Sequence, residues 1–233
     1  MLKRIVPRVA RRARLGVGLG LVNALETLTA AYGDTDKGEH GYLPYYRRHL
    51  GPRRRRQEVV FEIGVGGYDS RAASGSLAVW RDYLSRSTIV GLDLHEKDIN
   101  FGPRVHFVRA DQSDPVQLQV AVDRYGPPTV VIDDGSHIGE HIHASFRHLW
   151  PLMPSRSLYV IEDLSTSYQP DYGGGYPVPA VSGVALLQQL VDDVQFLDPV
   201  FVQRPRWASR PAAVHADVAA LHVYPGIAFV EKR

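Results

Sequence analysis

EVVFEIGVGG, residues 58–67, is a mostly apolar run that ends in a glycine-rich turn, and it decides the fold class of this chain. An apolar run of this length that is bounded by glycines is typical of a buried strand. The glycines let the backbone turn tightly and approach a ligand closely, at the point where a helix would begin. The stretch therefore predicts the first strand of a sheet and a candidate binding turn at its end.

The chain beyond this stretch alternates between strand and helix patterns. Further strands are predicted at 88–94, 104–110, 129–134 and 157–163, and helices at 74–84, 115–125, 139–149 and 184–194. Residues 220–233, ALHVYPGIAFVEKR, predict two short strands around Pro225-Gly226. Strands that are apolar on both faces and alternate with helices indicate a parallel sheet covered on both sides. We therefore predict a doubly wound α/β domain of seven strands with an antiparallel C-terminal hairpin.

The composition fits one globular domain with a full core. The chain has 233 residues, of which 44% are apolar and 22% charged, which excludes global disorder, collagen and a small disulfide scaffold. Residues 1–56 hold 13 Lys and Arg against 4 Asp and Glu, a net charge of +9, whereas residues 57–233 hold 14 against 21, a net charge of −7. We therefore divide the chain into residues 1–56, a basic and partly helical arm with a candidate active-site loop, and residues 57–233, a Rossmann-like α/β domain that would carry the ligand site.

The chain contains no cysteine, which excludes disulfides and thiolate metal sites. The longest uncharged apolar run near the start, residues 15–25, is too short to span a bilayer and is not followed by an A-x-A cleavage site. We therefore expect a cytoplasmic protein without stable membrane insertion.

Acidic residues stand at the ends of the predicted strands, where ligands bind in such sheets. Asp133 and Asp134 end the fourth strand, and Glu162 and Asp163 end the fifth. Carboxylates that are neighbours in space repel each other unless they are protonated or bridged by a cation. Hard oxygen ligands favour Mg²⁺, with Ca²⁺ or Mn²⁺ as alternatives. Some of these acids can instead be helix caps or solvated residues, and Asp133 in particular can have a supporting role.

The glycine turn and the acid at the end of the second strand, Asp93, together predict an adenosine-type nucleotide site. The Asp93 carboxylate can accept hydrogen bonds from both hydroxyls of a ribose. The dinucleotide fingerprint G-x-G-x-x-G is incomplete, because its third glycine would stand where Asp69 is. Asp111 and Gln112 follow the third strand and could contact an adenine ring, although a plain polar loop explains them equally well.

His137 lies three residues after Asp134, where it can overhang a metal-bound substrate without binding the metal. Histidine has an unperturbed pKa of about 6.5, which suits it to accept a proton at neutral pH. An alternative is a zinc-hydrolase motif, because residues 137–141 match H-x-x-E-H. That motif needs both histidines on one helical face, whereas His137 falls at the predicted turn. We expect His141, His143 and His148 on the helix surface.

Residues 164–182 form a connection that is too long for an ordinary loop in a compact domain. Tyr168, Tyr172 and Tyr176 in this segment offer flat faces with a polar group, which suits sugar rings or aromatic ligands. We expect a lid or a binding loop, with a plain mobile loop as the alternative.

Six segments together resemble the metal-dependent, S-adenosylmethionine-dependent sugar O-methyltransferases of the macrocin and mycinamicin type. They are TDKGEHGY (35–42), EIGVGG (62–67), GLDL (91–94), ADQSD (110–114), IDDGSH (132–137) and IEDLSTSY (161–168). The resemblance implies a class I methyltransferase-like fold. It also implies that Asp134, Glu162 and Asp163 bind Mg²⁺ and that His137 is the general base.

The same resemblance implies a cofactor site and an acceptor site. S-adenosylmethionine would be held by Glu62, Gly64, Gly66, Asp93, Asp111 and Gln112, together with Thr35 and Lys37. Asp36, together with Thr35 and Lys37, would close over the active site. Tyr168 and Tyr172 would belong to the substrate loop. The acceptor would be a saccharide or glycoside, and the enzyme a homo-oligomer, either a dimer or a tetramer.

The chain departs from the macrolide enzymes, which are longer at the N-terminus. In this respect it resembles short actinobacterial members, among them mycobacterial enzymes that methylate polysaccharides such as methylmannose polysaccharide. The particular acceptor therefore stays open.

Two alternative functions also stay open. A catechol-like phenol O-methyltransferase would share the fold and the cofactor, but such enzymes place a lysine base near the metal, and lysine is scarce here. A protein that binds nucleic acid or anionic membranes through its basic segment would lose affinity steeply with salt. The α/β part lacks basic residues interleaved with aromatic ones, so we expect no nucleic-acid partner. The arginines before residue 15 and Arg53–Arg56 are expected to face solvent or another subunit.

Overall fold

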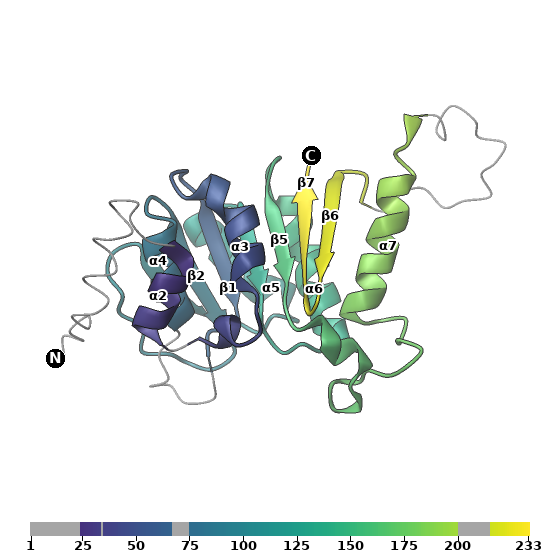
Figure 1. Ribbon diagram of the computed structural model, residues 1–233, viewed down its shortest axis with the longest axis horizontal. Helices are drawn as coiled ribbons and strands as arrows, with labels where there is room; N and C mark the ends of the chain where they lie inside the picture. The colour runs from purple at the N-terminus through teal and green to yellow at the C-terminus, as the bar shows by residue number, and fades with distance from the viewer. Residues whose placement is uncertain (1–23, 34, 67–74, 200–214) are drawn as a thin grey trace.

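A seven-stranded sheet forms the centre of the molecule, with its strands in the order β3-β2-β1-β4-β5-β7-β6 (Figure 1). The computed structural model describes residues 24–33, 35–66, 75–199 and 215–233. The strands are β1 (Val59–Ile63), β2 (Thr88–Asp93), β3 (Val105–Arg109), β4 (Val130–Asp133), β5 (Leu158–Ile161), β6 (Val218–Tyr224) and β7 (Ile227–Lys232). The first five pair in parallel, and β7 is antiparallel to both β5 and β6. This arrangement confirms the predicted doubly wound sheet and its C-terminal hairpin.

Helices cover both faces of the sheet (Figure 1). One face packs against α2 (Ala24–Tyr32), α3 (Leu43–Leu50) and α4 (Gly75–Tyr83). The opposite face packs against α5 (Pro115–Tyr125), α6 (Gly139–Leu152) and α7 (Gly183–Gln195). The short 3₁₀ helices are η1 (Asp36–Gly38), η2 (Gly51–Arg53), η3 (Leu164–Tyr168) and η4 (Pro170–Tyr172).

Alternate residues of the central strands enter the two cores. Phe61 and Ile63 of β1 pack into the core beneath α5, α6 and α7, whereas Val60 packs into the core on the other face. Side chains of a strand alternate between faces, so a strand that is covered on both sides is apolar throughout. This is why the strands stand out in the sequence as nearly continuous apolar runs.

The described part of the basic segment 1–56 contributes to the core. Leu25 and Leu28 of α2 and Tyr46 of α3 are fully buried, and they share a hydrophobic cluster with Val60 and Ile132. Arg53 bonds to Glu58, and the Arg54 guanidinium lies over the Tyr83 ring, so these two arginines contact the domain itself. The arginines before residue 15 lie outside the described residues.

Helix boundaries agree with the predictions except at the end of α6. The predicted helix 139–149 continues to Leu152 because Pro151 is accommodated in the last turn. Trp150 is buried there, and the Met153 N–H donates to the carbonyls of Leu149 and Trp150. In the part of the chain that the structure describes, no helix combines the length and the apolar character needed to cross a bilayer.

Candidate active site

The carboxyl ends of β1, β4 and β5 bring the predicted acidic residues together. Ile63 pairs with Asp133 and Asp133 pairs with Ile161, so the residues that follow these positions meet at one edge of the sheet. Asp134, Glu162 and Asp163 follow β4 and β5, and Glu62 is the next-to-last residue of β1. We refer to Glu62, Asp134, Glu162 and Asp163 as the carboxylate cluster.

Lys37 places its ammonium within the carboxylate cluster. Its Nζ lies 2.6 Å from Asp134 Oδ2, 2.6 Å from Glu162 Oε1 and 3.4 Å from Glu62 Oε1. Burial alone would lower the pKa of Lys37, but these three carboxylates raise it well above its ordinary value. Lys37 is therefore a buried cation held by carboxylates, and its contact with a cofactor stays a prediction.

Two tyrosines at the start of α3 donate hydrogen bonds to the cluster. Tyr46 Oη donates to Glu162 Oε1, and Tyr42 Oη donates to Asp163 Oδ1 at 2.7 Å. Burial and the neighbouring carboxylates raise the pKa of both phenols, which keeps them protonated. Sequence reasoning missed both residues, although their spacing of four places them on one helical face next to the TDKGEHGY segment.

Four carboxylates share one buried ammonium in this cluster, so without a bound metal the crowding favours a proton on one of them. Burial first, and then the charge of Asp134, raise the pKa of Glu162 to about 8, although Lys37 and Tyr46 oppose this shift. The side chains of Asp134 and Asp163 are 22% and 21% exposed, so a cation can reach them from solvent. A divalent cation such as Mg²⁺ would take the place of that proton, because it prefers hard carboxylate oxygens.

His137 lies over the open side of the cluster. Its Nε2 is 3.5 Å from Asp163 Oδ2, and potential ligand atoms of Asp134, His137 and Asp163 all lie within 4.8 Å of one another. His137 and Asp163 have φ angles of +58° and +52°, in the left-handed region that non-glycine residues rarely adopt. Such strained positions concentrate at functional sites.

A second histidine, His40, also contacts Asp163. Its Nδ1 lies 3.3 Å from Asp163 Oδ1, whereas His137 faces the second carboxylate oxygen, Oδ2. The residue belongs to the TDKGEHGY segment, but sequence reasoning did not single it out. The structure therefore adds His40 to the candidate site.

The H-x-x-E-H match does not form a zinc-hydrolase site. α6 begins at Gly139, so His137 precedes the helix, and His141 Nδ1 instead lies 2.8 Å from Ser136 Oγ. His143 Nε2 lies 2.9 Å from the carbonyl of Ser182. His141, His143 and His148 are partly exposed on α6, and the first two also contact neighbouring segments through these hydrogen-bond partners.

The glycine turn and Asp93 lie together, as the sequence predicts. Asp93 Oδ2 accepts a hydrogen bond from Val65 N at 3.0 Å, and Oδ1 accepts one from His95 N at 2.8 Å. Gly64 and Gly66 have φ angles of +82° and +84°. Residues 67–74, which include Asp69, lie outside the described part of the chain.

Gln112 holds the loop that carries Asp134 and His137. Its Nε2 donates to Asp133 Oδ1 at 2.9 Å, and its Oε1 accepts from Ser136 N at 2.8 Å. Asp133 is buried and also accepts from Ser145 and Tyr159, so it has the supporting role that the sequence left open. A contact of Gln112 with an adenine ring stays a prediction.

The remaining predicted residues, Thr35, Asp36 and Asp111, make local contacts or are exposed. Thr35 caps η1 by accepting from Lys37 N at 3.5 Å, and Asp36 is exposed. Asp111 Oδ1 accepts from Ser113 N and Oγ, and these hydrogen bonds lower the pKa of Asp111.

The substrate-loop tyrosines lie near the surface. Tyr168 and Tyr172 are 47% and 37% exposed, and the Tyr172 ring centroid is 6.0 Å from that of His137. Thr166 Oγ1 lies within hydrogen-bond distance of the carbonyls of Asp163 and His137, which anchors the 164–182 segment against the site.

Comparisons with known proteins give a consistent result, although no family model matches the chain. The chain is 42% identical over 214 residues to the 8-demethyl-8-alpha-L-rhamnosyl tetracenomycin-C 2'-O-methyltransferase of Streptomyces olivaceus, covering 91% of this chain and 55% of that protein. It is 38% identical over 231 residues to the demethylmacrocin O-methyltransferase of Streptomyces fradiae, covering 96% of this chain and 57% of that protein. The MycE methyltransferase from the mycinamycin biosynthetic pathway, solved in complex with Mg, SAH and mycinamycin VI, matches with a TM-score of 0.80 and 38% identity. That match covers 89% of this chain and 53% of the MycE chain.

The chain is a relative of the macrocin- and mycinamicin-type sugar O-methyltransferases. This confirms the resemblance that the six sequence segments indicate, and the MycE match confirms the fold. The chain spans about half the length of the curated relatives it matches. All five of those relatives are named O-methyltransferases. The likeness to mycobacterial polysaccharide enzymes stays a prediction.

Among the glycines that the structure describes, Gly64 is the one whose replacement we expect to destabilise the fold most. A Cβ at this position would lie 1.9 Å from the carbonyl oxygen of Asp134. We expect Gly64→Ala to lower the free energy of unfolding by at least about 2 kcal/mol, measured by urea denaturation. Gly173→Ala is the control, because Gly173 has a φ of +74° with open space around it. Gly173→Ala should lower the free energy of unfolding by only about 1 kcal/mol. Equal losses in the two variants would contradict the steric clash predicted at Gly64.

The burial of Lys37 leads to a second stability prediction. Lys37→Met leaves buried carboxylates without their cation, and we expect a loss of about 3–5 kcal/mol in unfolding free energy without metal. Added Mg²⁺ should restore part of this loss by supplying positive charge. Lys232→Met is the control, since Lys232 is also buried but pairs with Asp217. Thermal denaturation with and without Mg²⁺ tests this, and equal Mg²⁺ rescue of both variants would contradict it.

Proposed function

We propose that the protein is an enzyme that transfers the methyl group of S-adenosylmethionine to a sugar hydroxyl of a saccharide or glycoside, in a reaction that requires Mg²⁺. The observation that carries this proposal is the carboxylate cluster with His137 beside it, next to the glycine turn and Asp93. The names of the relatives support it, since they include O-methyltransferases that act on rhamnosyl groups.

Asp134, Glu162 and Asp163 are the residues that we propose to hold Mg²⁺. When bound, Mg²⁺ supplies a Lewis acid that lowers the pKa of a coordinated sugar hydroxyl. The partial exposure of Asp134 and Asp163 and the closeness of their ligand atoms support this choice, whereas Glu162 is buried and accepts from Lys37 and Tyr46. Lys37, Tyr42 and Tyr46 hold the carboxylates in place from the inner side. The solved MycE complex contains Mg, which is consistent with this assignment.

The proposed cofactor site lies at the ends of β1, β2 and β3. When bound, S-adenosylmethionine supplies the electrophilic methyl group. Asp93 has acceptor capacity left for a ribose beyond its two backbone hydrogen bonds, because each carboxylate oxygen carries two lone pairs. Gly64 and Gly66 allow the backbone to approach the cofactor closely. The other proposed contacts are Glu62, Asp111, Gln112, Thr35 and Lys37.

His137 is the proposed general base. Its side chain is 19% exposed, so an acceptor hydroxyl can reach it, and Asp163 contacts its Nε2. The imidazole would accept the hydroxyl proton as the oxygen attacks the methyl group. Tyr172 lies close enough to line the acceptor site, and we propose Tyr168 and Asp36 as further parts of that wall.

The structure argues against a phenol methyltransferase with a lysine base. Lys37 lies 2.6 Å from both Asp134 Oδ2 and Glu162 Oε1, an arrangement in which it serves as their ion-pair partner rather than as a free base. A screen with labelled S-adenosylmethionine tests the acceptor class directly. We expect Mg²⁺-dependent label transfer to saccharides or glycosides, including methylated mannose oligosaccharides. Transfer to catechols alone would overturn the proposal.

We also propose that the enzyme acts in the cytoplasm and assembles as a dimer or tetramer. Light scattering of the full chain tests the assembly, and a monomer at all concentrations would contradict it. A salt titration against DNA and anionic vesicles tests the binding-protein alternative. Tight, salt-sensitive binding would favour that alternative.

A further inference from the structure

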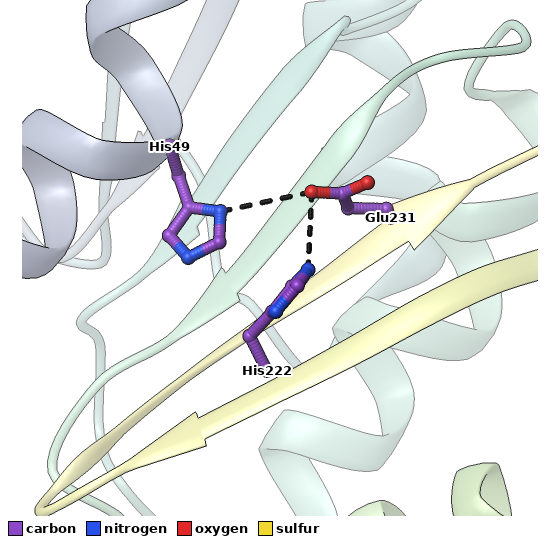
Figure 2. A group of neighbouring side chains, drawn as sticks. All are labelled: His49, His222 and Glu231. Atoms are coloured by element: carbon purple, nitrogen blue, oxygen red, sulfur yellow. Dashed lines mark ion pairs between the residues drawn. The ribbon is translucent and has the colours of Figure 1, made fainter.

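A second cluster of potential metal ligands lies where α3 packs on the β6–β7 hairpin. It consists of His49 near the end of α3, His222 of β6 and Glu231 of β7, and we call it the hairpin cluster. Figure 2 shows both imidazole rings turned toward the Glu231 carboxylate. Glu231 pairs with Leu158, the first residue of β5, whereas the carboxylate cluster follows the last residue of that strand. The two clusters therefore lie at opposite ends of β5.

The spacing of the three side chains fits a tetrahedral metal ion. His49 Nδ1 is 3.6 Å and His222 Nε2 is 3.3 Å from Glu231 Oε1, and the three ligand atoms lie within 4.8 Å of one another. In a tetrahedral Zn²⁺ site with bonds of about 2.0–2.1 Å, neighbouring ligand atoms are about 3.3 Å apart. Small side-chain shifts would therefore bring these atoms onto three corners of a tetrahedron.

The surroundings of His49 fix its ring in place. Its Nε2 lies 3.1 Å from Tyr224 Oη, and its ring stacks on Phe229 with centroids 4.3 Å apart. Metal-binding histidines almost always use their other ring nitrogen in such a hydrogen bond, which orients the ring. Its other ring nitrogen, Nδ1, is the atom that faces Glu231 and is thereby directed toward the proposed metal position.

The strand register presents the other ligands to the same point. His222 pairs with Phe229, so His222 and Tyr224 of β6 share a face of the hairpin with Phe229 and Glu231 of β7. His222 and Glu231 have side chains that are 31% and 43% exposed. A metal ion could therefore approach from solvent and keep a water molecule as its fourth ligand.

We propose that His49, His222 and Glu231 bind a divalent transition metal of the Zn²⁺ type, separate from the Mg²⁺ proposed for the carboxylate cluster. Two imidazole nitrogens and one carboxylate suit Zn²⁺, whereas Mg²⁺ prefers oxygen ligands alone. The metal would link the end of α3 to the terminal hairpin. The start of the same helix carries Tyr42 and Tyr46, which donate to Asp163 and Glu162. The bound metal would thus stabilise the helix that holds the active-site carboxylates.

Metal titration of the full chain, prepared without a histidine tag and stripped by chelation, tests this proposal. Saturating Mg²⁺ is added first to occupy the carboxylate cluster. We expect Co²⁺ to bind with the visible absorption of a tetrahedral complex and to be displaced by Zn²⁺. We also expect Zn²⁺ to raise the melting temperature.

Variants of the partly exposed ligands test whether the Co²⁺ and Zn²⁺ signals come from the hairpin cluster. His222→Ala and Glu231→Gln should each weaken Zn²⁺ binding by at least about tenfold, and Tyr224→Phe by about tenfold. His106→Ala is the matched control, because His106 stacks on Tyr125 beside β3, at the opposite edge of the sheet. It should bind Co²⁺ like the wild type. No tetrahedral Co²⁺ spectrum in the wild type, or an unchanged spectrum in a folded His222→Ala, would overturn the proposal.

Discussion

Replacing His137 by alanine is expected to lower kcat for methyl transfer by about 10²–10⁴-fold, the range that general-base catalysis contributes. The imidazole lies beside Asp163 on the open side of the carboxylate cluster, where an acceptor hydroxyl can meet it. The dissociation constant for S-adenosylmethionine should stay nearly unchanged, because the proposed cofactor contacts lie on other residues. Initial rates and calorimetric cofactor binding measure the two effects separately.

His40 provides a matched control for this prediction. It contacts the other oxygen of Asp163 and is partly exposed, so His40→Ala removes an interaction worth at most about 1 kcal/mol. We expect this variant to lose less than about tenfold in kcat. A larger loss in His40→Ala than in His137→Ala would assign the base to His40 instead.

Removing the divalent metal is the second change with a large expected effect. We expect exhaustive chelation to lower turnover by about 10³-fold, since a Lewis acid contributes several kcal/mol of transition-state stabilisation. Added Mg²⁺ should restore the rate. In Asp134→Asn, we expect the Mg²⁺ concentration for half-maximal rate to rise at least about a hundredfold, because this variant removes one proposed ligand charge.

Asp133→Asn is the control that separates metal binding from structural support. Asp133 is adjacent to Asp134 in sequence but accepts hydrogen bonds from Gln112, Ser145 and Tyr159 within the core. This variant should melt at a lower temperature, while its Mg²⁺ dependence shifts far less than that of Asp134→Asn. Full turnover of the chelated wild type would contradict the proposed role of the metal.

The sheet and the meeting of the acids could be predicted because both follow from local patterns. β4 and β5 are buried throughout, so their apolar runs are visible in the sequence, and the carboxyl ends of parallel strands share one edge. The places of Asp134 and Glu162 follow from this geometry. The boundaries of α5 were also predictable, because Asp114 caps the helix by accepting from Val116 N and Gln117 N.

The inner contacts of the cluster could not be predicted in the same way. Lys37 meets Asp134 and Glu162 across separations of 97 and 125 residues, and nothing in the local pattern around Lys37 specifies those partners. The tyrosines of α3 reach the cluster only because that helix packs over the sheet. The contact of His143 Nε2 with the carbonyl of Ser182 is likewise invisible in the local pattern, because 39 residues separate the two.

The position of β7 has a consequence for how the chain is made. β5 ends at Ile161, yet its outer neighbour, β7, begins only at Ile227. At a synthesis rate of about 5–20 residues per second, β5 waits for about 3–13 s before its partner leaves the ribosome. During that interval the strand edge next to Glu162 and Asp163 is open, and open edges template aggregation. A nascent chain stalled before Ile227 is therefore expected to need chaperone protection, and release at that stage should give aggregates rather than a smaller folded sheet.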